Sequence, residues 1–345
     1  MIWKVDGLFK DNNMFLKRDF AAQFSSDDVT IVTSDINHAC LVIDDNGQRI
    51  RSVCQSSSRV RSVAISKDGK AACGNIRGEI YIINVIFGKE LCVLRGHTKA
   101  IRHCVFNKNS SVLVSTSEDK EIRVWDLNKP GQHIVLKGHT DSVNICNFFK
   151  DDTRLLSSSH DGTLKIWDVR SGEMVKSISA HDNWILSSRM SPDDRFAVSV
   201  SSDKTAKVWD VATGKLLHTL DGHDDVIRTC CVSPNSRLLA TGNDLGVIKI
   251  WSLLDGREVG CCDGHNSWIT DITFSPDNQY LLSVGDNVKW WRIDGSSVQI
   301  FHIRGSFVRL IQSDADFERF VTIGNTGNLY ILSRIRESQK HAILV

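Results

Sequence analysis

The sequence predicts an all-β fold in which eight similar four-stranded sheets close into a ring. Two observations predict this fold. Histidine and tryptophan recur at a common spacing, and each period contains four short strand-like runs and no helix. A small sheet with two apolar faces cannot bury both alone, so neighbouring sheets must cover one another. A closed ring of such sheets also leaves no long free edge.

The repeat is visible in three residue types, of which two run through five repeats. The histidines, each 42 residues after the last, are His97, His139, His181, His223 and His265. The tryptophans are Trp125, Trp167, Trp209 and Trp251 at the same spacing, with Trp291 after 40 more residues. Three of the four prolines share the period of 42. Chance does not give three residue types one period, so the chain contains a true internal repeat.

One period shows the expected strands. Within residues 139–180, β-rich runs lie at 143–149, 155–159, 164–168 and 175–179. Residues typical of turns, such as Asp-Gly and Ser-Gly, separate these runs. Each unit is therefore expected to form four antiparallel strands.

Weaker copies of the tryptophan strand extend the series in both directions, with an aliphatic residue in the tryptophan place. The whole series is 43, 83, 125, 167, 209, 251, 291 and 332. Eight members predict eight sheets, with seven as the alternative. We expect one domain over residues 1–345, with 334–345 as a possible additional tail.

Ring closure needs one strand from the far end of the chain. Counting back by the repeat places an N-terminal strand near residues 12–17, which would complete the last sheet beside 329–333. The alternative is a strand from the tail at 341–344. Ile2 and Trp3 lie about one period before Ile43, where a preceding tryptophan strand would end, which indicates a cut from a longer repeat protein.

Composition narrows the function classes. Lys and Arg number 42 and Asp and Glu 41, so the net charge of +1 argues against a bulk nucleic-acid binder. No long apolar run predicts a membrane span, and the N-terminus lacks the pattern of a signal peptide. Ten cysteines without a C-x-x-C spacing indicate reduced thiols in a cytoplasmic chain. We interpret the adjacent pairs at 230–231 and 261–262 as packing residues.

Three repeats carry His, Ser, Asp and Trp at fixed separations, with 22 residues from His to Asp, 4 from Ser to Asp and 6 from Asp to Trp. The sets are His97, Ser115, Asp119 and Trp125; His139, Ser157, Asp161 and Trp167; and His181, Ser199, Asp203 and Trp209. A catalytic triad occurs once per site, so a set repeated in each unit indicates a structural hydrogen-bond network. In the fourth repeat we expect Ala240 in the serine place, and the fifth repeat has altered spacing.

No chemistry-bearing motif stands outside the repeat. The sequence contains no P-loop, no dinucleotide fingerprint and no metal-ligand spacing such as H-E-x-x-H. We therefore expect no enzyme activity, no cofactor and no metal.

Two tryptophans suggest a binding surface. Trp184 and Trp268 each lie three residues after a repeat histidine, where the innermost strand begins at one mouth of the ring, which we name the top face. They either plug the mouth and pack on a neighbouring loop or anchor a protein partner. Acidic residues crowd the same loops and turns: Glu118, Asp119, Asp141, Asp161, Asp182, Asp203, Asp224, Asp225, Asp244, Asp263 and Asp286. This combination suits a basic partner with an apolar spot.

A competing signal comes from arginine. Arg61, Arg102 and Arg228 occupy one equivalent position, two residues into the innermost strand. A ring of guanidinium groups at the channel mouth would bind phosphate or carboxylate groups.

The Gly-His pair, the later Asp and the Trp-Asp pair together resemble the WD-repeat β-propeller family over essentially the whole chain. A closer resemblance is to the C-terminal eight-bladed propeller of the apoptotic protease-activating factor family. The segments that carry it are residues 203–207, 239–242, 265–271, 274–277, 288–291 and 327–332.

That closer resemblance implies a non-enzymatic sensor that binds cytochrome c, a basic protein, with the help of a second propeller, and that holds a nucleotide-binding module inactive until then. It implies cytochrome c contacts for Trp268, for Asp119, Asp161, Asp203 and Asp244, and for Glu118 beside one of them; Trp184 joins this set by its equivalent position. The nucleotide-binding module and the second propeller are not in this chain. The alternative is a general adaptor that binds an acidic or phosphorylated peptide through the three arginines.

Overall fold

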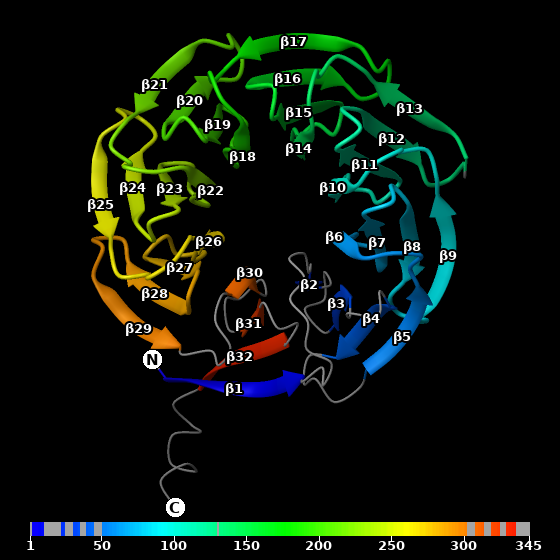
Figure 1. Ribbon diagram of the computed structural model, residues 1–345, viewed down its shortest axis with the longest axis horizontal. Helices are drawn as coiled ribbons and strands as arrows, with labels where there is room; N and C mark the ends of the chain where they lie inside the picture. Colours follow the sequence, from blue (N-terminus) through cyan, green and yellow to red (C-terminus); the bar gives the residue numbers. More distant parts are fainter. Residues whose placement is uncertain are drawn as a thin grey trace, which may run out of the picture.

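Figure 1 shows sheets arranged as the blades of a ring, each with its first strand toward the central axis. The computed structural model describes residues 2–9, 22–24, 30–34, 39–44, 50–129, 131–301, 308–313, 319–324 and 329–335. Within these residues every regular element is a strand, and the strands form eight four-stranded antiparallel sheets. The prediction of an all-β fold with eight blades is therefore confirmed.

The first four blades follow the chain in order. The first is β2 (Ala22–Phe24), β3 (Thr30–Ser34), β4 (Ala39–Asp44) and β5 (Ile50–Gln55). The second is β6 (Val60–Ile65), β7 (Lys70–Asn75), β8 (Ile80–Asn84) and β9 (Lys89–Leu94). The third is β10 (Ile101–Phe106), β11 (Val112–Ser117), β12 (Ile122–Asp126) and β13 (His133–Leu136). The fourth is β14 (Val143–Phe148), β15 (Arg154–Ser159), β16 (Thr163–Asp168) and β17 (Met174–Ser179).

The remaining blades continue the same way until the last. The fifth is β18 (Ile185–Met190), β19 (Phe196–Ser201), β20 (Ala206–Asp210) and β21 (Leu216–Leu220). The sixth is β22 (Ile227–Val232), β23 (Leu238–Asn243), β24 (Ile248–Ser252) and β25 (Glu258–Cys262). The seventh is β26 (Asp271–Phe274), β27 (Tyr280–Val284), β28 (Val288–Arg292) and β29 (Ser297–Phe301). The eighth is β30 (Val308–Ser313), β31 (Arg319–Gly324), β32 (Leu329–Ile335) and β1 (Ile2–Phe9).

All eight positions of the predicted tryptophan series lie on the third strand of a blade, from Ile43 on β4 to Leu332 on β32. The four strands expected within residues 139–180 also match β14 to β17 to within one residue at each end. The register of the repeat was therefore readable from the sequence.

The closing strand comes from the N-terminus, as expected, but from other residues. Ile2–Phe9 pairs antiparallel with Leu329–Ile335, and Trp3 lies opposite Arg334. The placement of this strand at residues 12–17 was wrong, and those residues lie outside the described ones, as does the alternative at 341–344. Trp3 is likewise on an outermost strand, not at the end of a preceding third strand. Counting back by the period assumes no insertion, whereas twelve residues separate β1 from β2.

The core lies between blades. One apolar cluster joins Val114, Ile122 and Val124 of the third blade to Leu155 and Trp167 of the fourth. Similar clusters join each of the other successive pairs of blades from the first to the seventh. Because apolar residues point to both faces of each sheet, every blade depends on both neighbours for its burial.

Trp290 does not belong to the tryptophan series. It is buried on β28 and packs edge-on against Phe320 of the eighth blade, with ring centroids 5.7 Å apart.

All ten cysteines are free, and most of them are buried. Cys261 is exposed, so the interpretation of this cysteine as a packing residue was wrong.

The turns between first and second strands, on the bottom face, link the third blade to the fourth and the fourth to the fifth. Asp152 and Asp194 adopt left-handed backbone conformations, with φ of 55° and 60°. Their carboxylates accept hydrogen bonds from the backbone N–H groups of Lys108 and Lys150, each in the preceding blade, at 2.9 and 2.7 Å. These contacts fix neighbouring turns relative to one another.

We predict that Leu156→Ala, at a fully buried position on β15, lowers the free energy of unfolding by about 2–5 kcal/mol, because it leaves a cavity between blades. The matched control is Leu217→Ala, at a position 41% exposed on β21, which should change the free energy of unfolding by no more than about 0.5 kcal/mol. Urea denaturation monitored by tryptophan fluorescence measures both. Equal losses in the two variants would contradict the assignment of the core to the space between blades.

Candidate functional site

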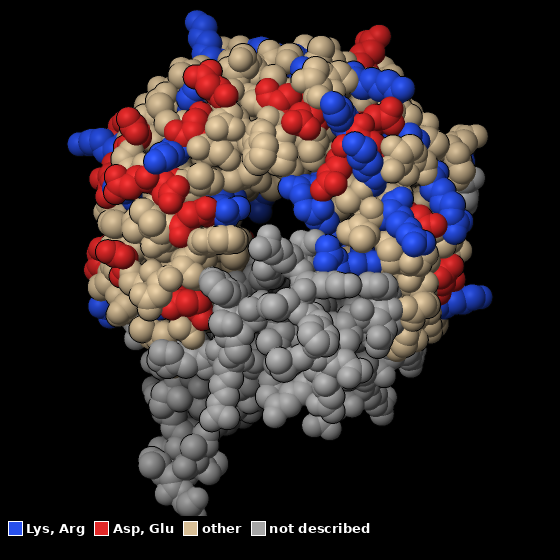
Figure 2. Space-filling view, viewed as in Figure 1, with Lys and Arg blue, Asp and Glu red and all other residues tan. Residues whose placement is uncertain are grey.

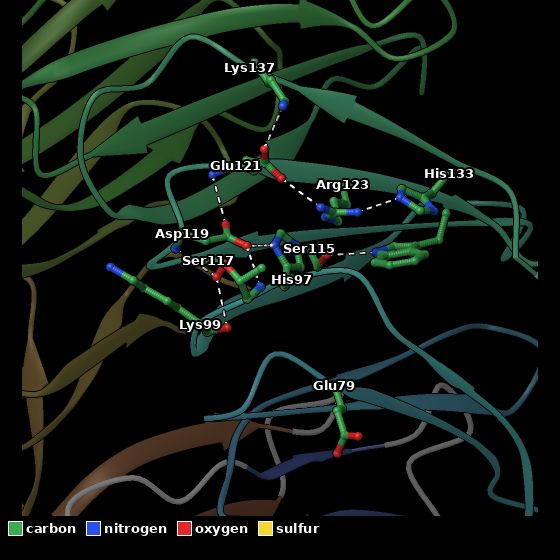
Figure 3. Close-up of polar contacts among 12 residues, drawn as sticks. Glu79, His97, Lys99, Ser115, Ser117, Asp119, Glu121, Arg123, His133 and Lys137 are labelled. Atoms are coloured by element: carbon green, nitrogen blue, oxygen red, sulfur yellow. Dashed lines mark hydrogen bonds and ion pairs between the residues drawn. The ribbon is translucent and has the colours of Figure 1, made fainter.

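The third blade contains a chain of hydrogen bonds that begins at its top turn (Figure 3). His97 Nδ1 lies 2.8 Å from a carboxylate oxygen of Asp119, and His97 Nε2 lies 2.8 Å from the hydroxyl of Ser115. The indole N–H of Trp125 donates to the same hydroxyl at 2.8 Å. The fully buried Ser115 hydroxyl thus joins the ring of His97 to the indole, and Asp119 fixes the other side of His97.

The fourth and fifth blades repeat this chain through His139 and His181, with corresponding distances between 2.7 and 3.1 Å. The seventh blade keeps it as well despite its altered spacing. There His265 contacts Asp286 at 2.5 Å and Ser283 at 2.7 Å, and Trp291 donates to Ser283. The shorter turn moves the acid by one residue without losing the contact.

The aspartates of these chains are held as anions. Burial raises the pKa of Asp119, but hydrogen bonds from His97 and from the backbone N–H groups of Thr98 and Glu121 outweigh it and lower the pKa to about 2. The side chain of Asp119 is only 6% exposed and that of Asp161 only 5%. These two carboxylates contribute charge to the top face but little contact area.

The sixth blade breaks the pattern in a different place from the one expected. Thr241, not Ala240, takes the serine place: its hydroxyl lies 2.7 Å from His223 Nε2 and accepts the indole N–H of Trp251 at 2.8 Å. The expectation of Ala240 was wrong because it counted from Asp244, which is one residue early. Leu245 occupies the aspartate place, so His223 Nδ1 is buried without a hydrogen-bond partner.

Asp244 instead corresponds to Glu118 of the third blade, and both acids face arginines. Asp244 forms a two-pronged ion pair with Arg228, with one distance of 2.7 Å. Glu118 accepts from Arg61 at 2.7 Å and from Arg102 at 3.4 Å. The structure therefore brings two groups of sequence candidates together, the acids proposed for a basic partner and the arginines proposed for an anion.

The two exposed tryptophans pack on the blade before their own. Trp184 stacks on His160, with ring centroids 4.7 Å apart and an interplanar angle of 16°. The guanidinium of Arg228 lies 4.5 Å from the ring centroid of Trp268. Even so, 51% of Trp184 and 45% of Trp268 remain exposed, and so does 55% of Leu245. Each indole thus has one face against the protein and one toward solvent.

Charge is distributed unevenly around the ring. The loops that open the fifth, sixth and seventh blades carry the exposed acids Asp182, Asp224 and Asp263. We name these three acids, together with Trp184, Leu245 and Trp268, the acidic tryptophan surface. Figure 2 shows acidic side chains gathered on the half of the visible face over β20 to β25, and more basic ones on the opposite half, over β6 to β13.

Two other kinds of site were sought in the described part of the chain. No group of three or more His, Cys, Asp or Glu side chains there is placed to hold a metal ion. No helix in the same residues is long and apolar enough to cross a membrane.

Comparison with known proteins identifies the family. A model described as "WD domain, G-beta repeat" matches residues 88–126, 131–168, 172–210, 214–252 and 256–288, which is more than half of the chain. The chain belongs to the WD-repeat family. Members of this family are protein-interaction scaffolds, and they typically have no enzyme activity. The matched segments contain the repeat histidine and its serine or threonine partner of the third to seventh blades.

Individual relatives include proteins named apoptotic protease-activating factor 1. Apoptotic protease-activating factor 1 of Danio rerio is 36% identical over 126 residues, which is 36% of this chain and 10% of that protein. The human protein of that name is 39% identical over 56 residues, 16% of this chain and 4% of that protein. The target of rapamycin complex subunit wat1 of Schizosaccharomyces pombe is 30% identical over 105 residues, 30% of this chain and 33% of that protein. The chain thus spans a third or less of each of these relatives.

The sixth blade of this WD-repeat chain gives a gain-of-stability test. We predict that Leu245→Asp raises the free energy of unfolding by about 1–2 kcal/mol, because the new carboxylate reaches the unpaired Nδ1 of His223. Leu254→Asp, at a 79% exposed turn position, is the control for replacing a surface leucine by aspartate and should give no gain. Chemical denaturation at neutral pH measures both. A Leu245→Asp protein no more stable than the control protein would contradict the alignment of Leu245 with Asp119.

The same variant changes the response to acid. Burial lowers the pKa of His223 from 6.5 to about 4, so the folded state keeps this ring neutral where the unfolded state binds a proton. Stability therefore falls as the pH drops from about 6.5 towards 4. In Leu245→Asp the nearby carboxylate raises the pKa of His223, so the loss of stability between pH 7 and pH 5 should be smaller than in the parent. Denaturation of both proteins at pH 7 and pH 5 measures the loss of stability. An equal loss in the parent and in Leu245→Asp would argue against contact between the new carboxylate and His223.

Proposed function

We propose that this propeller is the sensor part of an apoptosome-forming protein and that its acidic tryptophan surface binds cytochrome c. The observation that carries the proposal is the presence of two half-exposed indoles among exposed acids on one side of the top face. Similarity to apoptotic protease-activating factor 1 supports the choice of this partner.

The tryptophans supply the apolar part of the contact. An indole already packed on one face loses little conformational freedom when a partner covers the other, and tryptophan is enriched among residues that dominate binding energy. Trp268 is better placed than Trp184 to form this apolar contact. It packs on the sixth blade, and that blade also exposes the apolar side chain of Leu245.

The acids supply attraction at longer range. Asp182, Asp224 and Asp263 are exposed, whereas Asp119, Asp161 and Asp203 are hydrogen-bonded within the histidine chains. The exposed aspartates are available to contact lysines of the partner. The hydrogen-bonded aspartates add to the negative electrostatic potential of the surface. Such a surface raises the association rate of a basic protein and makes binding depend on ionic strength.

The sequence suggested that Asp244 and Glu118 contact the partner directly, but in this proposal they do not. Each is paired with arginine, so its charge is largely offset before a partner arrives. The same pairing weakens the alternative of a general adaptor that binds acidic or phosphorylated peptides through Arg61, Arg102 and Arg228. We therefore favour the basic partner. The autoinhibitory contact with a nucleotide-binding module, the second propeller and the cytoplasmic location remain part of the proposal.

The test is a titration of the chain with cytochrome c by isothermal calorimetry at low and moderate salt. We expect weak binding at low salt that weakens further as salt rises, since one propeller supplies only part of the proposed clamp. Trp268→Ala should weaken binding about tenfold or more, as expected for the loss of a central aromatic contact.

The matched control is Phe87→Ala, which removes the ring of a 75% exposed aromatic on the rim of the second blade. It should leave cytochrome c binding unchanged. Absence of binding at low salt, or equal effects of the two substitutions, would contradict the assignment of this surface. Binding of a phosphorylated peptide that is lost in Arg102→Ala would favour the adaptor instead.

A further inference from the structure

A cavity of about 510 Å³ lies on the bottom face, away from the acidic tryptophan surface. It is formed where the first strands of the second to fifth blades, β6, β10, β14 and β18, end and turn back. Each of these strands begins at the top face beside the tryptophan positions and ends at the cavity. The two surfaces are therefore at opposite mouths of the ring.

Three lysines line the cavity at one equivalent turn position on successive blades. They are Lys67, Lys108 and Lys150, and all three are exposed. The next blade carries Pro192 at this position, so the series ends where the cavity ends. The ammonium of Lys108 donates to the backbone carbonyl of Lys150, which holds that cation against the neighbouring turn.

The walls between the lysines are apolar. Val105, Phe106, Phe148 and Met190 line the cavity and are only partly buried by the packing between blades. Such a wall accommodates an apolar side chain, and the cations above it accommodate carboxylates on either side of that side chain.

The two acids in the lining are hydrogen-bonded to the backbone. The carboxylates of Asp152 and Asp194 are directed to the backbone N–H groups of the preceding turns, as described above. The second oxygen of Asp152 is buried and accepts no hydrogen bond. A buried acceptor of this kind is normally satisfied, and a backbone N–H group of a bound chain is a suitable donor.

We propose that this cavity is a second interaction site and that it binds a short acidic protein segment that carries an apolar side chain. The apolar side chain enters between Phe106 and Phe148, and acidic residues beside it pair with Lys108 and Lys150. A peptide fits better than a bulk polyanion, because the cations occupy three discrete positions around a concave apolar wall. The proposal does not depend on cytochrome c binding, since it concerns the other mouth of the ring.

The experiment is fluorescence anisotropy of the full chain with a labelled peptide of aspartate and glutamate residues around two central leucines. We expect binding that weakens about tenfold or more in the double variant Lys108→Glu/Lys150→Glu. The matched control is Lys99→Glu/Lys120→Glu, which makes the same change of charge at exposed positions of the top face. It should leave peptide binding within about twofold of the parent.

Two further peptides separate charge from apolar contact. A peptide with asparagine and glutamine in place of the acids, and one with serine in place of the leucines, should each bind more weakly than the parent peptide. Equal binding of all three peptides, or equal losses in the two double variants, would overturn the proposal. So would stronger binding of anionic lipid vesicles or single-stranded DNA than of the acidic peptide through the same lysines.

Discussion

The structure depends on one constraint: a four-stranded sheet with two apolar faces must be covered on both. The first to seventh blades meet this constraint by sharing apolar clusters with their neighbours. Trp167 of the fourth blade, for example, lies in one cluster with Val114 and Val124 of the third. Burial therefore restricts the residue types within the strands, whereas the residue types in the turns at the two mouths of the ring can vary. Variation at the turns is where this chain differs from one repeat to the next, and both proposed sites lie there.

The histidine chains serve that constraint at the top face. A buried indole N–H needs an acceptor, and a serine or threonine hydroxyl supplies one only if its own position is fixed. The histidine fixes the hydroxyl, and the aspartate fixes the histidine. For this reason we interpret these sets as structural, although their residue types resemble a catalytic triad: the serine hydroxyls are fully buried and hydrogen-bonded within the blade.

Much of the fold could be predicted, because the positions that pack between blades keep the same spacing from one repeat to the next. The third-strand positions from Ile43 to Leu332 were correct, since each fills the same place between blades. The closing strand was placed wrongly, because the length of the connection after it is not constrained by packing. At the site, the positions of Trp184 and Trp268 could be predicted from their distance to a repeat histidine. The pairing of Arg228 with Asp244 could not, because the spacing of the repeat does not fix the direction in which a partly exposed side chain turns.

A substitution at the aspartate place explains how one blade becomes distinct without losing its fold. In the third to fifth blades an aspartate lies 22 residues after the histidine, and its side chain is at most 20% exposed. In the sixth blade Leu245 holds this place, and its side chain reaches solvent. The acid one residue earlier, Asp244, pairs with Arg228, which lies over Trp268. One substitution thus exchanges an internal contact for an exposed apolar group on the blade against which Trp268 packs. At the bottom mouth, the change from lysine to proline after the fourth blade similarly limits the cations to one part of the ring. In both cases the core repeat is unchanged, because only groups outside the faces shared between blades differ.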